Sequence, residues 1–261
     1  MNMALDWSLL LPAFIAGLLV LATHVPLGIR VLSRGIVFID LAIAQIAGLG
    51  VIAAGSLGFE PQGWGVQVSA ITAALLGAAL FSWTEKYWPE VQEATIGILF
   101  VLAASSSVLL LAGDPHGGDH MQDLLAGQIL WVNPAQLWPV GLLTILLVTI
   151  LLWRRERLGG LAFYGLFACA VTASVQLVGV YLVFASLILP AMATRKFTSV
   201  RRTPAALLLG ALSYACGLAM ASWLDLPPGP LIVWLLALLG LVLYALSPNT
   251  RKAPIKSGVA A

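Results

Sequence analysis

Asp40 is the residue with the clearest capacity for chemistry, because it interrupts the apolar run IVFIDLAIAQIAGLG six positions after Arg34. A carboxylate inside a membrane-spanning segment is costly and usually faces a bundle interior or an aqueous path. If a helix begins near Ile36, Asp40 lies about 6 Å into it at the helical rise per residue. We therefore predict that Asp40 lines a translocation path. The alternative is an interfacial carboxylate that pairs with Arg34 or caps a helix start.

Small side chains follow Asp40 on the same face of the predicted helix. Counting by three and four gives Ala44, Ala47, Gly48 and Val51. Such a stripe lets another backbone approach or lets a narrow path open. Gln45 lies about 140° round the helix from Asp40. We expect Gln45 to hydrogen-bond a neighbouring helix, and contact with a substrate is the alternative.

A second group of possible ligands lies in the segment DPHGGDHMQD. His116, Asp119 and His120 offer imidazole and carboxylate donors within five residues, which suits Zn²⁺ or a similar ion. The alternative is an ordinary polar loop outside the membrane. His24, at the predicted end of the first apolar run, is interpreted as an interfacial or packing residue.

Several catalytic patterns are missing from the sequence. There is no GxxxxGK[ST] phosphate loop, so we expect that the chain does not hydrolyse nucleotide itself. There is also no HExxH, no GxSxG, and no Asp–Asp or Ser–His pair within the apolar runs. We therefore predict that the chain is not an enzyme. No basic and aromatic surface suggests nucleic acid as a partner.

The composition requires a membrane. Of 261 residues, 61% are hydrophobic and only 9% are charged, and the mean hydropathy is +1.00. A soluble domain carries roughly 25% charged residues. We predict an all-α, polytopic transmembrane helical bundle over residues 1–247, followed by a disordered basic cytoplasmic tail over 248–261.

The basic residues set the expected topology. Nine spans are predicted at about Trp7–His24, Ile36–Gly55, Val66–Trp83, Thr95–Gly113, Ala135–Trp153, Leu161–Val175, Leu177–Thr194, Ala205–Trp223 and Pro230–Leu246. With nine spans, all 13 Lys and Arg fall on one side, which the positive-inside rule makes the cytoplasm. We predict a multi-pass protein of the bacterial inner membrane, with its N-terminus outside and its C-terminus inside.

The sixth and seventh spans are unusually short. Only the residues from Leu158 to Thr194 lie between the basic residues Arg157 and Arg195, and two crossings need about 20 residues each. We expect either two short helices with a tight turn near Gln176 to Gly179, or a partly re-entrant element. Interrupted segments of this kind often mark a transport pathway.

Three stretches together resemble the metal-ion permease family of ABC importers, the membrane subunits for zinc, manganese and iron. They are VLSRGIVFIDLAIAQIAGLG from Val31, VGVYLVFASLILPAMATR from Val178, and LDLPPGPLIV from Leu224. The segments ATIGILF and DLLAGQIL add weaker support. The family usually carries a His four residues after the Asp, and the pair is implicated in the metal path. Here that position is Ala44, so only Asp40 carries over.

The resemblance implies a function and partners. It implies a permease subunit that imports a divalent transition-metal ion, zinc or manganese, as a transported substrate and not as a permanent cofactor. It implies a homodimer that binds cytoplasmic ATPase subunits, which use the ATP, and receives ions from a periplasmic binding protein. The ATPase would dock on the segment from Arg195 to Pro204, through Arg195, Lys196, Arg201 and Arg202. Remaining metal ligands would come from water, backbone carbonyls near Gly179, or the second copy.

Two other functions fit the same residues. The chain could be a secondary transporter that uses Asp40 as a proton or cation site, which differs in needing no separate ATPase. It could also be a membrane scaffold in which Asp40 is structural, and its deletion would then leave metal accumulation unchanged.

Overall fold

The computed structural model describes residues 7–60, 63–111, 129–153 and 159–247, and within them the chain forms nine α-helices and no strand. The helices are α1 (Trp7–Arg34), α2 (Ile39–Ser56), α3 (Trp64–Tyr87), α4 (Gln92–Leu111), α6 (Pro134–Trp153), α7 (Gly160–Val178), α8 (Val180–Ala193), α9 (Ser199–Leu224) and α10 (Pro228–Leu246). Two 3₁₀ turns, η1 (Pro89–Val91) and η2 (Ile129–Trp131), precede α4 and α6. Eight helices are long and apolar enough to cross a membrane, and α8 is a shorter apolar helix. The predicted polytopic all-α bundle is confirmed.

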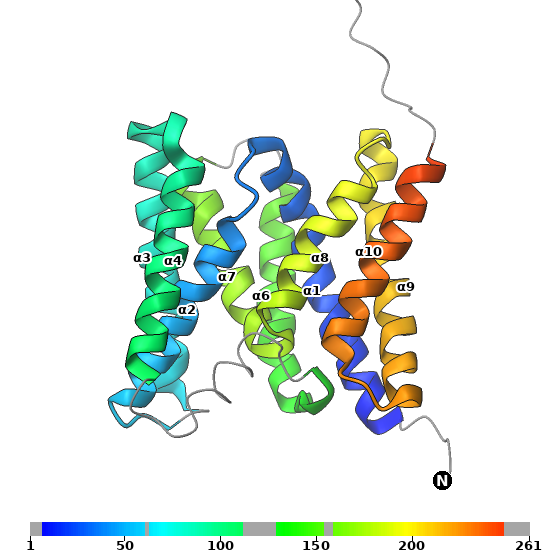
Figure 1. The fold of residues 1–261 in the computed structure, drawn as a ribbon, viewed down its shortest axis with the longest axis horizontal. Helices are drawn as coiled ribbons and strands as arrows, with labels where there is room; N and C mark the ends of the chain where they lie inside the picture. Colours follow the sequence, from blue (N-terminus) through cyan, green and yellow to red (C-terminus); the bar gives the residue numbers. More distant parts are fainter. Residues whose placement is uncertain (1–6, 61–62, 112–128, 154–158, 248–261) are drawn as a thin grey trace, which may run out of the picture.

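Successive helices run in opposite directions, so α1 begins at one end of the bundle and α10 finishes at the other (Figure 1). The Lys and Arg residues that the structure describes all lie near one end: Arg30, Arg34, Lys86, Arg195, Lys196, Arg201 and Arg202. We call this end the basic end. Contacts between helix termini show that these residues share one end, since Nη1 of Arg34 in α1 lies 3.7 Å from Oε1 of Glu85 in α3. Arg30 of α1 also donates to the carbonyl of Leu151 in α6 at 2.9 Å.

Tryptophan side chains mark two levels along the bundle. Five exposed tryptophans lie near the end opposite the basic end, namely Trp7, Trp64, Trp131, Trp138 and Trp223. Three more lie near the basic end: Trp83, Trp88 and Trp153. Tryptophan is enriched at both interfaces of a membrane because its ring is apolar and its N–H needs a polar partner. The two levels therefore fit a bundle that spans a bilayer between them.

The first helix is longer than the sequence predicts. The predicted span stops at His24, but α1 continues to Arg34 and has 28 residues. Pro26 lies inside α1 without ending it, which neighbouring helices make possible in membrane proteins. His24 is consequently in the interior of the helix and fully buried. Of the two interpretations of His24, the structure fits a packing residue and not an interfacial one.

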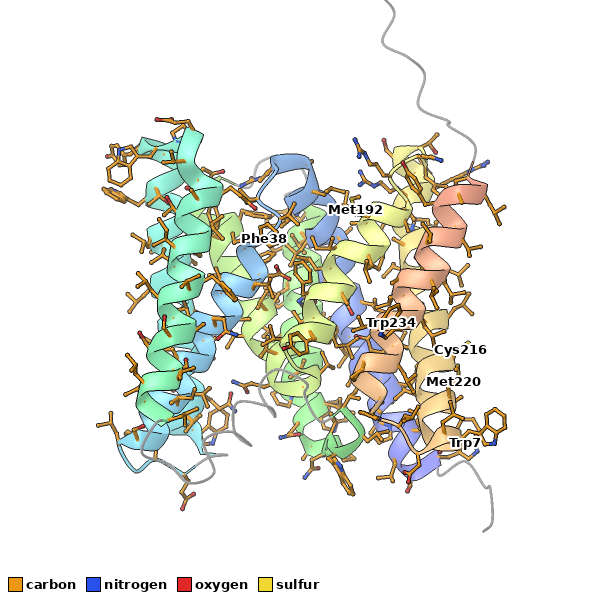
Figure 2. All side chains as sticks on the ribbon, in the orientation of Figure 1. Trp7, Phe38, Met192, Cys216, Met220 and Trp234 are labelled. Atoms are coloured by element: carbon orange, nitrogen blue, oxygen red, sulfur yellow. The ribbon has the colours of Figure 1, made fainter. Side chains whose placement is uncertain are left out.

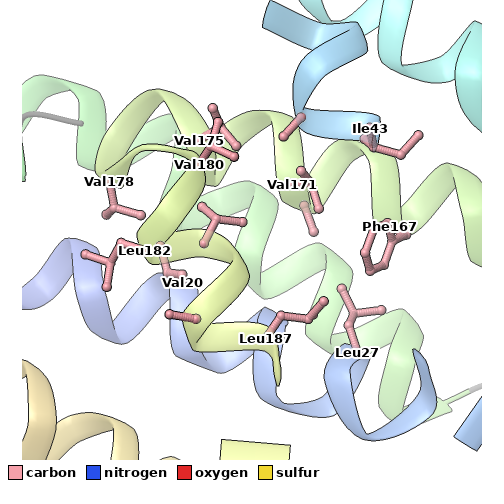
Figure 3. Close-up of a cluster of buried hydrophobic side chains, with 14 of the residues drawn as sticks. Val20, Leu27, Ile43, Phe167, Val171, Val175, Val178, Val180, Leu182 and Leu187 are labelled. Carbon is pink, nitrogen blue, oxygen red and sulfur yellow. The ribbon is translucent and has the colours of Figure 1, made fainter. Parts of the chain in front are cut away.

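A sharp break at Gly179 separates α7 from α8, as predicted. Gly179 has φ 81° and ψ 164°, a conformation that is essentially restricted to glycine. The chain reverses direction there, and Val175 and Val180 lie close together on either side of the break (Figure 3). At 14 residues, α8 is about 21 Å long, less than the thickness of a hydrocarbon core. The prediction of two short helices with a tight turn is therefore confirmed.

The core forms where α1, α7 and α8 pack together. Val20 and Leu27 of α1 lie beside Leu182 and Leu187 of α8 (Figure 3). A β-carbon on Gly28 would meet the carbonyl oxygen of Leu187 at 1.9 Å, so α1 and α8 touch backbone to backbone at this point. This close approach holds α8 in the centre of the bundle, as small residues do at other membrane helix contacts.

The helix order generates a prediction about sidedness. With Cys169 and Cys216 replaced by alanine, single cysteines at Glu60, Glu90 and Ser199 should report which side of the membrane three of the helix connections face. We expect Glu90→Cys and Ser199→Cys to react with an impermeant thiol reagent only after the cytoplasm is opened, because the positive-inside rule assigns the basic end to that side. Glu60→Cys should react in intact cells. Labelling of Glu60→Cys and Ser199→Cys from the same side would contradict the nine-helix topology.

Candidate functional site

Asp40 is buried with no partner for its charge. Its side chain is 1% exposed, and neither carboxylate oxygen has a hydrogen-bond partner among the described residues. The backbone N–H groups of Asp40 itself and of Leu41 lie beside the carboxylate at the start of α2. A buried ionisable group is normally paired or bound to a metal, so the free oxygens of Asp40 identify a candidate ligand site.

The start of α2 lies well inside the bundle. The helix begins at Ile39, three residues later than predicted, so Asp40 is in its first turn. Phe38 nevertheless stacks on Phe184 of α8, with ring centroids 6.5 Å apart, and Figure 2 labels Phe38 beside α2 and away from the basic end. Phe184 precedes the end of α8 by nine residues, up to about 14 Å along the helix. Asp40 is therefore at membrane depth although it is close to a helix terminus.

The predicted alternative of an ion pair between Asp40 and Arg34 is not what the structure shows. Arg34 lies 3.7 Å from Glu85 and 4.1 Å from the ring centroid of Phe163, and neither Asp40 oxygen accepts a hydrogen bond from it. The start of α2 has no side-chain capping bond at Phe38. An ion pair with Arg34 is thus missing as an explanation for the carboxylate, whereas the backbone N–H groups of Asp40 and Leu41 at the helix start lie beside it.

Glu93 is a carboxylate that the sequence analysis did not single out. It lies in the first turn of α4, as Asp40 does in α2, and these two helices pack against one another (Figure 1). Glu93 Oε1 accepts a hydrogen bond from the N–H of Phe38 at 3.4 Å. Glu93 Oε2 is buried and has no partner among the described residues. The sequence signal that could have found it is an acid in the first turn of a second apolar helix.

A buried polar network holds the start of α4 in place. Thr84 Oγ1 donates to Gln92 Oε1 at 2.8 Å. The Gln92 amide nitrogen donates to the carbonyl of Phe81 at 3.0 Å and to the Tyr164 hydroxyl oxygen at 3.2 Å. These bonds join α3, α4 and α7 directly beside Glu93. Because a satisfied buried network is rigid, it positions Glu93 against the backbone of Phe38.

The stripe below Asp40 is buried, as its residue types suggest. Ala44 and Ala47 are 2% and 3% exposed, and Gly48 is buried as well. Gln45 is 9% exposed and projects from a different side of α2. Gly179 is buried between α7 and α8. A role for Gln45 or for carbonyls near Gly179 in a path remains a prediction.

The predicted docking segment is shorter in the structure. The loop expected from Arg195 to Pro204 ends at Thr198, because α9 begins at Ser199 and contains Arg201 and Arg202 in its first turn. Arg195 and Arg201 are exposed. Thr198 and Ser199 suit a helix start, because threonine and serine inside a helix compete with the backbone for its hydrogen bonds.

The other two basic residues of the segment hold helices together. Lys196 donates to the carbonyl of Tyr244 at 2.9 Å and lies 4.1 Å from its ring centroid. Arg202 donates to the carbonyl of Ala191 at 3.1 Å. Lys196 thereby joins the connector to the end of α10, and Arg202 joins α9 to the end of α8.

The outer histidine segment lies outside the described residues. His116, Asp119 and His120 fall in 112–128, so their predicted metal contact stays a prediction. The same holds for the tail 248–261. Among the residues that the structure describes, no group of three or more His, Cys, Asp or Glu side chains is placed to hold a metal ion.

Known proteins resemble the chain along most of its length. It is 26% identical over 203 residues to the "Probable iron transport system membrane protein" of Haemophilus influenzae, covering 70% of this chain and 72% of that protein. It is 27% identical over 268 residues to the "Manganese transport system membrane protein MntC" of Halalkalibacterium halodurans, covering 94% and 89%. A solved chain of PsaBC from Streptococcus pneumoniae, in complex with Fab, has the same fold, with a TM-score of 0.73, 20% identity and 94% of each chain covered.

The family model described as "ABC 3 transport family" matches residues 6–164 and 158–247, which is nearly the whole bundle. Its membrane permease subunits are not themselves the enzymes of the transporter, and they reside in the bacterial inner membrane. The chain therefore belongs to the ABC 3 transport family, as a multi-span membrane permease.

Proposed function

We propose that the chain is the permease subunit of an ATP-driven importer and that its substrate is a divalent transition-metal ion, in the range from manganese to zinc. The observation that carries the proposal is the buried Asp40 carboxylate, whose two oxygens have no partner among the described residues. Relatives named for iron and manganese transport support the substrate class.

The energetics of Asp40 explain why a cation would stop there. A charged Asp in a membrane helix costs about 2.5–3.5 kcal/mol on insertion scales. A divalent ion offsets that cost, because attraction between opposite charges is strong where water is scarce. The buried small residues Ala44 and Ala47 leave space along the same face of α2. An ion could therefore bind in passing without a deep, closed cage.

The partners follow from what the chain lacks. It has no phosphate loop for nucleotide, so ATP would be hydrolysed by a separate cytoplasmic subunit. A periplasmic binding protein would deliver the ion at the end opposite the basic end. A second copy of the chain would cover the stacked pair Phe38 and Phe184, of which Phe38 is 51% exposed, and could add ligands.

The ATPase would dock on the connector between α8 and α9. Arg195 and Arg201 are exposed there, and Val200 between them is 84% exposed, so apolar and basic groups are available together. Lys196 and Arg202 serve this surface indirectly, because their bonds fix the connector to α10 and α8. Movement of the ATPase would thus reach α8, which packs against α1 and contacts Phe38 through Phe184.

The first test removes one charge. Asp40→Asn keeps the size of the side chain, and we expect folded, inserted protein whose metal uptake falls at least about tenfold, the equivalent of 1.4 kcal/mol. Uptake of radioactive manganese and zinc into cells that depend on this transporter measures the effect. Glu90→Gln is the matched control, since Glu90 is exposed near the same end and should transport normally. Normal uptake by Asp40→Asn would make Asp40 a structural residue.

The second test concerns docking. A photo-crosslinking residue at Ser199 should capture the ATPase subunit, because Ser199 begins α9 between the exposed Arg195 and Arg201. The same residue at Glu60, at the other end of the bundle, should not. Capture from Glu90 with none from Ser199 would move the docking surface to the connection between α3 and α4.

A further inference from the structure

Two carboxylates near the start of α2 carry oxygens without a hydrogen-bond partner among the described residues. Asp40 contributes two buried oxygens without partners among the described residues, and Glu93 contributes one more, Oε2. The two side chains are tied to one short stretch of backbone, because Glu93 Oε1 accepts the N–H of Phe38, two residues before Asp40. Both carboxylates therefore belong to one local structure, although they come from helices more than fifty residues apart in the sequence.

Among the described residues, no His or Cys side chain completes a group of three with these carboxylates. One helical turn beyond Asp40 on the same face is Ala44, a buried methyl group. His24 lies on α1, where its Nδ1 is 3.0 Å from both the Val20 carbonyl and the Thr23 hydroxyl. No cluster of three or more His, Cys, Asp or Glu side chains able to hold a metal occurs in the described part of the chain, so His24 is not a third ligand beside the two carboxylates.

Ligand type discriminates between divalent metals. Carboxylate, carbonyl and water oxygens suit manganese, whereas zinc is held mostly by imidazole and thiolate. Any one site still tends to bind zinc more tightly than manganese. Leaving out nitrogen and sulfur donors removes most of the contacts that zinc prefers, and water completes the larger coordination shell of a harder ion.

We propose that Glu93 is the second carboxylate of an ion site with Asp40, and that this oxygen-only donor set makes the chain a manganese path that disfavours zinc. The proposal rests on the proposed function, since it requires a divalent ion to pass Asp40. It adds a ligand from α4 and a choice among metals. Gln92 acts as a positioning residue, because its bonds to Phe81, Thr84 and Tyr164 hold the first turn of α4.

The test compares manganese with zinc in the same assembled transporter, using each metal ion alone as the probe. Glu93→Gln keeps the bond from Phe38 possible and removes the charge, and it should lower manganese uptake at least about tenfold. Glu93→Asp, which keeps the charge on a shorter side chain, should retain more uptake than Glu93→Gln. Ala44→His places an imidazole one turn from Asp40 and should raise the ratio of zinc to manganese uptake at least about tenfold. Glu90→Gln serves as the control.

The outcomes distinguish a failure of this inference from a failure of the proposed function. If Asp40→Asn loses uptake while Glu93→Gln transports manganese normally, the proposed function stands and the role of Glu93 is overturned. If wild-type protein carries zinc in preference to manganese and Ala44→His leaves the ratio unchanged, the metal choice is overturned. If Ala44→His fails to insert, manganese uptake by the wild-type protein is measured with excess unlabelled zinc present. Uptake that zinc does not inhibit supports the metal choice, and uptake that zinc abolishes overturns it. If neither metal depends on the chain, the proposed function fails and this inference with it.

Discussion

The absence of water from the core of a bilayer is the constraint on which this structure depends, because it leaves every buried polar group to find a partner within the protein. Most of them do so here. Thr84, Gln92 and Tyr164 satisfy one another across three helices, and Ser186 of α8 bonds Tyr214 of α9 at 2.9 Å. Asp40 is a buried carboxylate to which no side chain among the described residues donates a hydrogen bond. A buried carboxylate that no cationic side chain among the described residues neutralises is a position suited to a cationic ligand that arrives from outside.

The polar contacts at the basic end give Asp40 a fixed frame. Arg34 joins the end of α1 to Glu85 of α3 and to the ring of Phe163 in α7. The Gln92 network joins α3 and α7 to the start of α4, and Glu93 then reaches the backbone at Phe38. On the other side, the Phe38–Phe184 stack connects the start of α2 to α8, and Lys196 and Arg202 connect the next segment to α10 and α8. The proposed ligand site and the proposed docking surface are therefore both in contact with one helix, α8.

Much of the fold could be predicted from the sequence because lipid imposes long apolar runs and segregated charges. The succession of apolar helices in the described residues, eight of them long enough to cross a membrane, and the break near Gly179 follow from those two patterns. The end of α1 and the start of α2 could not be predicted in the same way. Pro26 and Arg30 suggest that the first helix ends at His24, but α1 continues past them because it packs against α8 and α6. Asp40 could be found because a carboxylate in an apolar run is conspicuous. Glu93 could have been noticed as an acid at the start of a second apolar helix, but its relation to Asp40 could not be predicted, because it depends on the pairing of α2 with α4. The bonds of Lys196 to α10 were hidden for the same reason.

The central claim is that an ion stops at the Asp40 carboxylate during transport. It is tested most directly by the amount of manganese that the purified transporter retains when the ATPase is inactive and free ions have been removed by gel filtration. Wild-type protein should retain manganese above a control with no permease, and Asp40→Asn should fall to the level of that control while remaining assembled with its ATPase. Equal retention by the wild-type and Asp40→Asn proteins would contradict the account, because the ion would then be held by other groups.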